Sequence, residues 1–259
     1  MASDQQLLDY VLRLADSDLI LAQRLGEWVG HGPVLEEDIA LTNVGLDLLG
    51  QARLWFAYAG EIEAREVGSS GVGRSEDEFA FMREGGGFRN LLLAEQPNGN
   101  YADTTARQFY FDVWHELLLR NLAVSRDRRI AEIAAKALKE VMYHAERSAD
   151  WVIRLGDGTE LSHTRMQSGI DDLWMYTGEM FAADDTDLAL AAEGVAADVG
   201  ALLPAWRDRV AAVLDLATLT MPSAAWMQRG GKQGVHSEHL GHLLAEMQSL
   251  QRAHPGAQW

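Results

Sequence analysis

Apolar side chains recur three and four residues apart along most of the chain, which is the spacing of amphipathic helices. The pattern predicts long helices over residues 4–28, 33–65, 102–123, 126–155 and 160–181. A short turn joins the first two segments, so these two helices are expected to pack antiparallel, and the fold is expected to rest on four long antiparallel helices. No run of alternating β-branched residues predicts a strand. The fold class is therefore expected to be all-α.

Three shorter helices complete the prediction, over residues 75–82, 205–217 and 236–253. The first begins at Ser75 with a glutamate three residues later, which is the signature of a capping box. Residues 184–204 are rich in alanine and show no clear pattern. The chain is expected to form a single helical domain, with extra helices added to four long ones at its C-terminal end.

The segment from Pro33 to Ala59 is the most apolar of the predicted helices. Between Ile39 and Ala59 it carries only two charged residues, Asp47 and Arg53. A helix that is apolar on all sides is normally buried on all sides, and we expect this of the segment. An unpaired buried charge is costly, so Asp47 needs an explanation. It is either a metal ligand or the remnant of one.

Composition and charge exclude several classes of protein. The chain has 259 residues, 47% of them apolar, a formal net charge of −17 and no cysteine. A nucleic-acid-binding protein needs the opposite charge, and the missing cysteine excludes disulfides and thiolate sites. No apolar run is long enough to span a membrane, and the first residues lack the pattern of a signal peptide. We expect a cytoplasmic protein, whose acidic charge favours solubility or a basic partner.

A large bundle of long antiparallel helices resembles the ferritin-like proteins. In these, two helices give one glutamate each and two give a Glu-x-x-His pair, and together they hold two irons. Only Glu160 and His163 have this spacing in the chain, and they stand in the first turn of a predicted helix rather than in its middle. We interpret this pair as polarity typical of a helix start.

Positions equivalent to di-iron ligands should lie about 30 residues apart on paired helices, one long helix plus a turn. On the first pair these positions are Asp18 and Asp47, and on the second pair they are Gln108 and His144. Gln108 is not a carboxylate, and neither Asp47 nor His144 has its Glu-x-x-His partner. The sequence predicts a vacated di-iron site at these four positions, with no metal bound and buried hydrogen bonds in its place.

If the alignment to the ligand positions is shifted by one helical turn, a second set of candidate ligands results. It would use Asp112 and His115 on one helix and Glu140 with His144 on the next. Even this set does not complete six ligands. Three histidines at positions 236, 239 and 242 form a separate cluster, in which a pair could share an adventitious metal.

Five long stretches of the sequence resemble the C subunit of the phenylacetyl-CoA 1,2-epoxidase family, and together they span nearly the whole chain. They are WVGHGPVLEEDIALTNVGLDLLGQAR (Trp28 to Arg53), RNLLLAEQPNGNYADTTARQFYFDVW (Arg89 to Trp114), RLGDGTELSHTRMQ (Arg154 to Gln167), LWMYTGEMF (Leu173 to Phe181) and RGGKQGVHSEHLGHLLAEMQSLQRAHP (Arg229 to Pro255). The glycines at 68–73 and 85–87 depart from the family in predicted loops. The resemblance implies a ferritin-like bundle.

The resemblance also implies a role in aerobic phenylacetate catabolism. A subunit of this kind is expected to be a structural, non-catalytic component of a monooxygenase complex. Its partner, the A subunit, would hold the di-iron centre, bind the CoA thioester and insert one oxygen atom into the aromatic ring. Other subunits, including an NADPH-dependent reductase, would deliver electrons, and the chain could form a homodimer when alone. No cofactor, nucleic acid or membrane partner is expected.

Two other functions stay open from the sequence. The chain could be a di-iron oxygenase subunit that itself binds metal, through Asp18 and Asp47 together with the shifted set of Asp112, His115, Glu140 and His144. A ferritin-like storage protein is a third reading, but it needs a ferroxidase ligand set that the sequence does not supply. The metal content of the isolated chain separates these readings.

Overall fold

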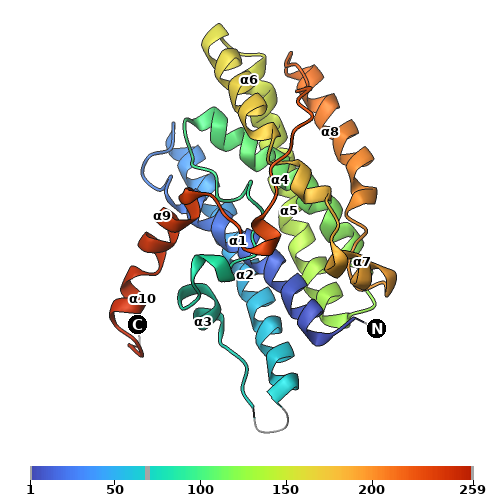
Figure 1. Ribbon diagram of the computed structural model, residues 1–259. Coiled ribbons are helices and arrows are strands. Elements are labelled where there is room, and N and C mark those ends of the chain that lie inside the picture. Colours follow the sequence, from blue (N-terminus) through green and yellow to red (C-terminus); the bar gives the residue numbers. More distant parts are fainter. Residues whose placement is uncertain (1, 68–70, 258–259) are drawn as a thin grey trace. The chain divides into compact units, whose positions relative to one another are not determined.

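A computed structural model describes residues 2–67 and 71–257 of the chain. The described residues form ten α-helices and four short 3₁₀ helices, and they contain no β-strand (Figure 1). The all-α prediction is confirmed. The chain divides into two compact units, which are described one at a time: residues 1–96 with 230–259 form unit 1, and residues 97–229 form unit 2. The single domain stays a prediction.

Unit 1 is built on two long helices that lie side by side, α1 (Asp4–Gly26) and α2 (Leu35–Val67). A capping box between Ser3 and Gln6 starts α1. Both helices match the predicted segments to within two residues at each end, because a short turn and the apolar spacing define them well. The predicted glycine-rich loop after α2 lies in part outside the described residues.

The remainder of unit 1 consists of short elements joined by irregular chain. They are α3 (Glu76–Phe81), η1 (Gly85–Gly87), η4 (Gly231–Gln233), α9 (Glu238–Met247) and α10 (Ser249–Ala253). The predicted capping box at Ser75 is confirmed. The predicted helix over residues 236–253 is corrected: it begins only at Glu238 and is divided at Gln248, so His236 precedes it.

Unit 2 is built on α4 (Tyr101–Leu122) and α5 (Arg128–Gly156), which again lie side by side, with α6 (Glu160–Trp174) packed against both. It continues through η2 (Gly178–Phe181), α7 (Asp185–Ala192), η3 (Gly200–Leu202) and α8 (Leu203–Leu216). Pro204 stands in the first turn of α8, as predicted. The stretch at 184–204 that showed no clear pattern holds α7 and η3.

The predicted helix over residues 160–181 ends early, at Trp174. The Thr177 hydroxyl donates a hydrogen bond to the Trp174 carbonyl at 2.8 Å, which satisfies a group at the helix end. The backbone then turns through Gly178, where a Cβ atom would lie only 2.6 Å from Cγ of Met227. A glycine is therefore needed where two segments of unit 2 meet.

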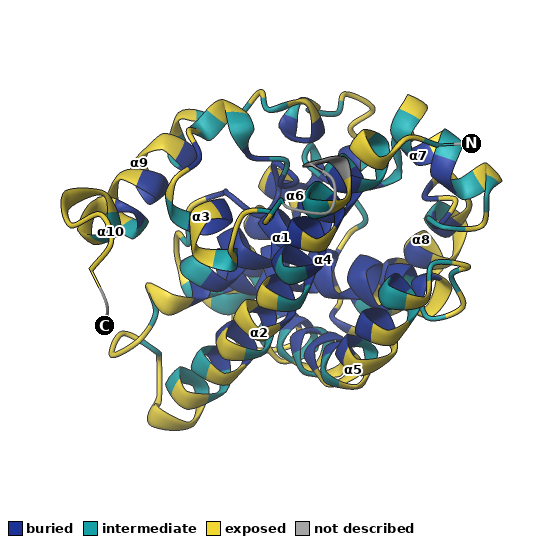
Figure 2. Cartoon of the chain, turned by 90° about the horizontal axis from the view of Figure 1, so that it is seen from below, coloured by how far each residue is buried: buried dark blue, intermediate teal, exposed yellow. Residues whose placement is uncertain are grey.

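The all-round burial predicted for the segment from Pro33 to Ala59 is wrong. One face of α2 is buried, and the other leaves four large apolar side chains in solvent, as the yellow positions along α2 in Figure 2 indicate. These are Leu35, Ile39, Leu46 and Leu49, with exposed fractions of 72, 52, 59 and 40%. They share one side of the helix at 100° per residue and are called the α2 stripe below. α4 is instead the helix buried around nearly its whole circumference.

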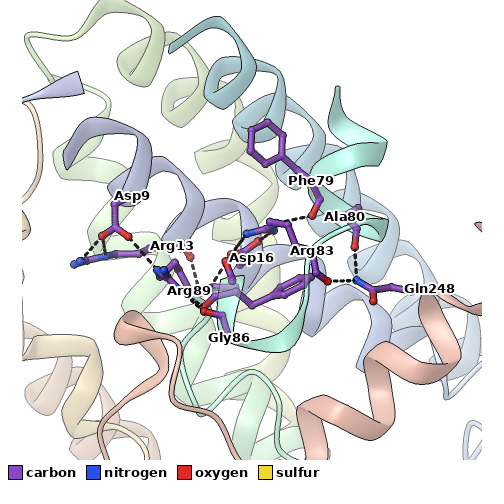
Figure 3. Close-up of polar contacts among 12 residues, drawn as sticks. Asp9, Arg13, Asp16, Phe79, Ala80, Arg83, Gly86, Arg89 and Gln248 are labelled. Carbon is purple, nitrogen blue, oxygen red and sulfur yellow. Dashed lines mark hydrogen bonds and ion pairs between the residues drawn. The ribbon is translucent and has the colours of Figure 1, made fainter. Parts of the chain in front are cut away.

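A buried ion pair anchors the irregular part of unit 1 (Figure 3). Asp16 of α1 is fully buried, and its carboxylate accepts hydrogen bonds from both terminal nitrogens of Arg83 and from the backbone N–H of Arg89. Arg83 also donates to the carbonyl oxygens of Phe79 at 2.6 Å and Gly87 at 2.9 Å. One guanidinium therefore joins α1, the end of α3 and the chain that follows.

The Arg83→Met variant is expected to destabilise the protein by about 3–5 kcal/mol, because it leaves the Asp16 carboxylate buried without its cation. Denaturant titration of the full chain measures this loss as a change in the unfolding midpoint. Arg128→Met is the matched control, since Arg128 pairs with Glu132 at a site where its side chain is 91% exposed. This control is expected to change stability little. Equal losses in the two variants would contradict the anchoring role of Arg83.

Candidate functional site

Unit 2 contains a buried polar cluster between α4 and α5. Gln108, Asp112 and His115 face it from α4, and His144 and Ser148 come from α5. All five side chains are at least 98% buried. The three- and four-residue spacings within each helix bring these groups to one side. Two of the four predicted site positions, Gln108 and His144, therefore belong to one cluster, together with Asp112 and His115 from the alternative set.

The surroundings of the cluster disfavour charge. Burial raises the pKa of Asp112 to about 6, although His144, Ser148 and Gln108 each favour its ionised form. Burial also lowers the pKa of His115 to about 3, and His144 adds to this effect. His115 is therefore neutral at physiological pH, and Asp112 holds its proton more tightly than an ordinary aspartate.

One hydrogen bond and two aromatic contacts hold side chains of the cluster in position. The Gln108 amide nitrogen donates to Oδ1 of Asp112 at 2.6 Å, one helical turn further along α4. Aromatic packing fixes the imidazole of His115, whose ring lies 5.1 Å from Phe111 and 6.1 Å from Trp114 between centroids. The arrangement can hold or pass a proton between Asp112 and its neighbours, but burial separates it from solvent.

The cluster does not fit a di-iron centre. Iron in a ferritin-like site is held by ionised glutamates and Glu-x-x-His pairs. Here an amide, Gln108, stands at one predicted position, and Glu140 of the alternative set is only partly buried. Within each unit, the described residues contain no group of three or more His, Asp or Glu side chains placed to hold a metal ion. The absence of a cofactor stays a prediction.

The other two predicted positions belong to unit 1. Asp18 lies fully buried on α1, whereas Asp47 of α2 is only partly buried. The buried acid of greatest structural consequence on α1 is instead Asp16, two residues away, which pairs with Arg83. Sequence spacing could not single out Asp16, because its partner is 67 positions further along the chain.

The Glu-x-x-His pair of Glu160 and His163 stands in the first turn of α6, as the sequence predicted. Glu160 is exposed in the first turn of α6. The His163 ring nitrogen Nδ1 lies 2.7 Å from the Gly156 carbonyl oxygen and so ties the start of α6 to the end of α5. The pair secures a turn between two helices.

The three histidines near the C-terminus do not form one site. His236 precedes α9, and its ring lies between Oε2 of Glu95 at 2.8 Å and the Phe88 carbonyl oxygen at 3.1 Å. His242 is exposed on α9, and His239 is partly buried. Residues three apart share a face only within a helix. Because His236 lies outside α9, helical geometry does not bring it beside His239 as the predicted metal pair required.

Glu95 is the centre of a second buried network that sequence analysis missed. Its side chain is fully buried and accepts hydrogen bonds from Asn90 at 2.9 Å and the Ser237 backbone N–H at 2.7 Å, as well as binding His236. Arg24 donates to the Glu95 carbonyl oxygen from two nitrogens. This network fixes the start of the C-terminal segment in unit 1.

Comparison with known proteins places these features in context. A protein-family model described as phenylacetic acid catabolic protein matches residues 1–259. The chain is also 52% identical, over 254 residues, to the C subunit of 1,2-phenylacetyl-CoA epoxidase from Escherichia coli (strain K12). That match covers 98% of this chain and 99% of the relative. Among the described residues, no helix has the length and apolar character needed to cross a membrane.

The stability contributed by His236 is expected to depend on pH. Burial lowers the pKa of His236, but hydrogen bonds to Glu95 and Phe88 and the nearby carboxylates outweigh this and raise the pKa above its ordinary value. Both facing oxygens are acceptors, so both ring nitrogens donate only in the imidazolium form. A pKa raised on folding stabilises the protein fully below about pH 6.5, and this stabilisation is lost as pH rises through the folded-state pKa.

The His236→Gln variant is therefore expected to lose more unfolding free energy at pH 6 than at pH 9, as measured by denaturant titration at both values. His242→Gln is the control, because His242 is exposed on the neighbouring helix. The control is expected to show almost no loss at either pH. A loss in His236→Gln that is the same at both pH values would rule out a charged His236 in the folded state.

Proposed function

Because the chain belongs to the phenylacetic acid catabolic protein family, we propose that it acts as the C subunit of a phenylacetyl-CoA 1,2-epoxidase in phenylacetate catabolism. The observation that carries this proposal is the 52% identity to the Escherichia coli C subunit, which extends over nearly the full length of both chains. The role proposed for it is structural: it pairs with the di-iron A subunit and stabilises it.

The buried cluster of unit 2 supports a non-catalytic role. A catalytic di-iron subunit needs several ionised carboxylates directed at one point. In this chain an amide occupies one position, and burial raises the pKa of the neighbouring Asp112 to about 6. Within the cluster the Gln108 amide donates to the Asp112 carboxylate, and the cluster is buried between the two helices. A former ligand site that now serves packing would have these features.

The α2 stripe supports an interaction with another subunit. Large apolar side chains aligned on one helix face are unfavourable in water, and such patches mark interaction surfaces in soluble proteins. An apolar groove of about 230 Å³ borders the stripe, between α1 and α2. Leu46 and Leu49 of the stripe line it together with Leu19 and Val29. A helix of the A subunit is the proposed occupant.

The remaining partners follow from the same proposal. The A subunit is the one expected to bind the CoA thioester and to insert the oxygen atom. Electrons would reach it through other subunits that include an NADPH-dependent reductase. This division of labour leaves the present chain without a cofactor of its own, and its activity would appear only within the complex.

Iron content tests the structural role directly. The chain is expressed alone with iron supplied, purified and analysed by elemental methods, beside an A subunit prepared in the same way. The proposal expects iron far below one atom per chain here and a loaded A subunit as the positive control. Iron approaching two atoms per chain would instead make this a catalytic di-iron subunit, as the alternative reading requires.

If the α2 stripe binds the A subunit, a charged side chain at position 46 should lower the affinity between the two subunits. Leu46→Lys is expected to weaken binding to the A subunit at least about tenfold, because the lysine would be buried at an apolar interface. The matched control is Leu188→Lys on α7, since both leucines are 59% exposed. Affinity is measured by surface plasmon resonance, and folding by circular dichroism. Equal affinities of the two folded variants would remove the stripe from the interface.

A further inference from the structure

The chain that leaves α8 crosses the surface of unit 2 without regular secondary structure (Figure 1). Residues 220–229 contain neither a turn nor a bend, so their backbone runs nearly straight, and they are called the extended segment below. In its middle, Ser223, Ala224, Ala225 and Trp226 are exposed. The segment therefore resembles a single strand lying on a helical unit.

The extended segment is attached at three points to α6 and to the turn that follows this helix. The Gln167 side chain accepts from the Thr220 N–H at 2.8 Å and donates to the Thr220 carbonyl oxygen at 3.0 Å. Nε1 of Trp174 donates to the Ala224 carbonyl oxygen at 3.0 Å, and the Gln228 N–H donates to a carbonyl oxygen just after α6 at 2.8 Å. The segment is thus held in its extended form before any partner arrives, and binding needs little further ordering.

The backbone groups that make these three attachments all belong to even-numbered residues. In an extended chain the N–H and C=O of one residue point to the same edge, and those of the next residue point to the opposite edge. The even-numbered residues therefore face α6. The odd-numbered residues Met221, Ser223, Ala225 and Met227 direct their backbone groups to the other edge, called the outer edge below. Pro222, which has no N–H to donate, falls on the edge that faces α6.

The outer edge has no hydrogen-bond partner among the described residues. From Met221 to Met227 no backbone N–H donates to a described group, and the one carbonyl oxygen that accepts, that of Ala224, faces α6. A row of unpaired N–H and C=O groups is a template on which another extended chain can add as a strand. Two residues of this edge, Ser223 and Ala225, have small side chains that leave room for a second backbone.

The surroundings of the outer edge indicate the chemistry of the partner strand. Trp226 is 61% exposed, and aromatic side chains stabilise paired strands through cross-strand contacts. The extended segment carries one charged residue, Arg229, and the cleft that it borders is lined by this arginine and Arg207 but by no Asp or Glu. In a chain of net charge −17, this positive charge favours a strand with carboxylate side chains and disfavours a second copy of the chain.

We propose that the outer edge of the extended segment is a docking site for an extended, acidic segment of another epoxidase subunit, which adds to it as a β-strand. Backbone hydrogen bonds to Ser223 and Ala225 would align the incoming strand, and an apolar side chain of that strand would pack on Trp226. Its carboxylates would be attracted by Arg207 and Arg229. The docking surface rests on the geometry of unit 2, whereas the source of the strand rests on the proposed function.

Hydrogen–deuterium exchange of individual backbone amides tests the pairing directly. In the chain alone, the N–H groups of Ser223 and Ala225 are expected to exchange quickly. Addition of the other epoxidase subunits, or of a short peptide of alternating glutamate and valine, is expected to slow both at least about tenfold. The exchange of Ala224, whose N–H is on the edge facing α6, is expected to change little.

A pair of proline variants separates the two edges of the extended segment. Ala225→Pro removes a donor from the outer edge, and Ala224→Pro is the matched control because it removes one from the edge that faces α6. Proline is compatible with an extended backbone, and circular dichroism checks that both variants fold. Ala225→Pro is expected to weaken binding of the subunits and of the peptide at least about tenfold, whereas the control changes it little.

Each outcome decides for or against the docking site. Slower exchange at Ser223 and Ala225 with either probe supports it, and protection by the peptide alone supports the surface while counting against the proposed source of the strand. Unchanged exchange with both probes overturns the site, as does equal slowing at Ala224 or equal binding by the two folded variants. A peptide of alternating lysine and valine that protects equally well overturns the acidic class. Iron content and the affinity of Leu46→Lys test the proposed function independently of these amides.

Discussion

The buried pair of Asp16 and Arg83 is the interaction on which unit 1 depends. The chain from Met82 to Gln96 has little regular structure, so its backbone groups need partners from outside. Asp16 accepts from one N–H of this segment, and the Ser17 hydroxyl accepts from the Leu91 N–H at 3.1 Å. α1 thereby supplies, through side chains, the hydrogen bonds that a neighbouring helix or strand would otherwise provide.

The C-terminal part of unit 1 depends on the same arrangement. The Gln248 side chain donates to the carbonyl oxygens of Ala80 and Arg83, and Arg252 donates to that of Arg83 as well. At the other end of the segment, Glu95 binds His236 and the start of α9. α9 is therefore attached to residues 80–96, which Asp16 in turn holds on α1. Loss of the Asp16 carboxylate would therefore also weaken the attachment of α9 and α10 through these contacts.

The buried acids of the two units are stabilised in different ways. In unit 1, Asp16 pairs with the Arg83 guanidinium and Glu95 binds the His236 ring. Each carboxylate also accepts from a backbone N–H, and these contacts offset the cost of removing a carboxylate from water. In unit 2, Asp112 has a glutamine donor and neighbouring imidazole groups, and burial raises its pKa to about 6. A metal ion would be a third way to stabilise buried acids. For Asp112, the structure shows a hydrogen bond and a raised pKa instead.

Periodicity predicted the helices well, because the spacing of apolar residues and the turn residues are local features of the sequence. The early end of α6 was missed, because the chain after Trp174 packs closely against Met227 at Gly178, and periodicity does not reveal a contact 49 residues away. The same limit hid Asp16, whose role is defined by Arg83. Within the candidate site, Gln108 and His144, which are 36 positions apart, do lie in one buried cluster. Sequence spacing could not show that Asp18 and Asp47 differ in burial.

The contrast between α2 and α4 shows why sequence alone cannot separate core from interface. Both helices carry apolar residues around much of their circumference, but the chain buries α4 almost completely and leaves the α2 stripe in water. The hydrophobicity of a helix face indicates that burying it is favourable. It does not indicate whether the same chain or a partner protein buries it. The fold leaves the α2 stripe in water, and exposed apolar side chains lower the solubility of an isolated chain. This is why the α2 stripe is the surface for which a partner is proposed.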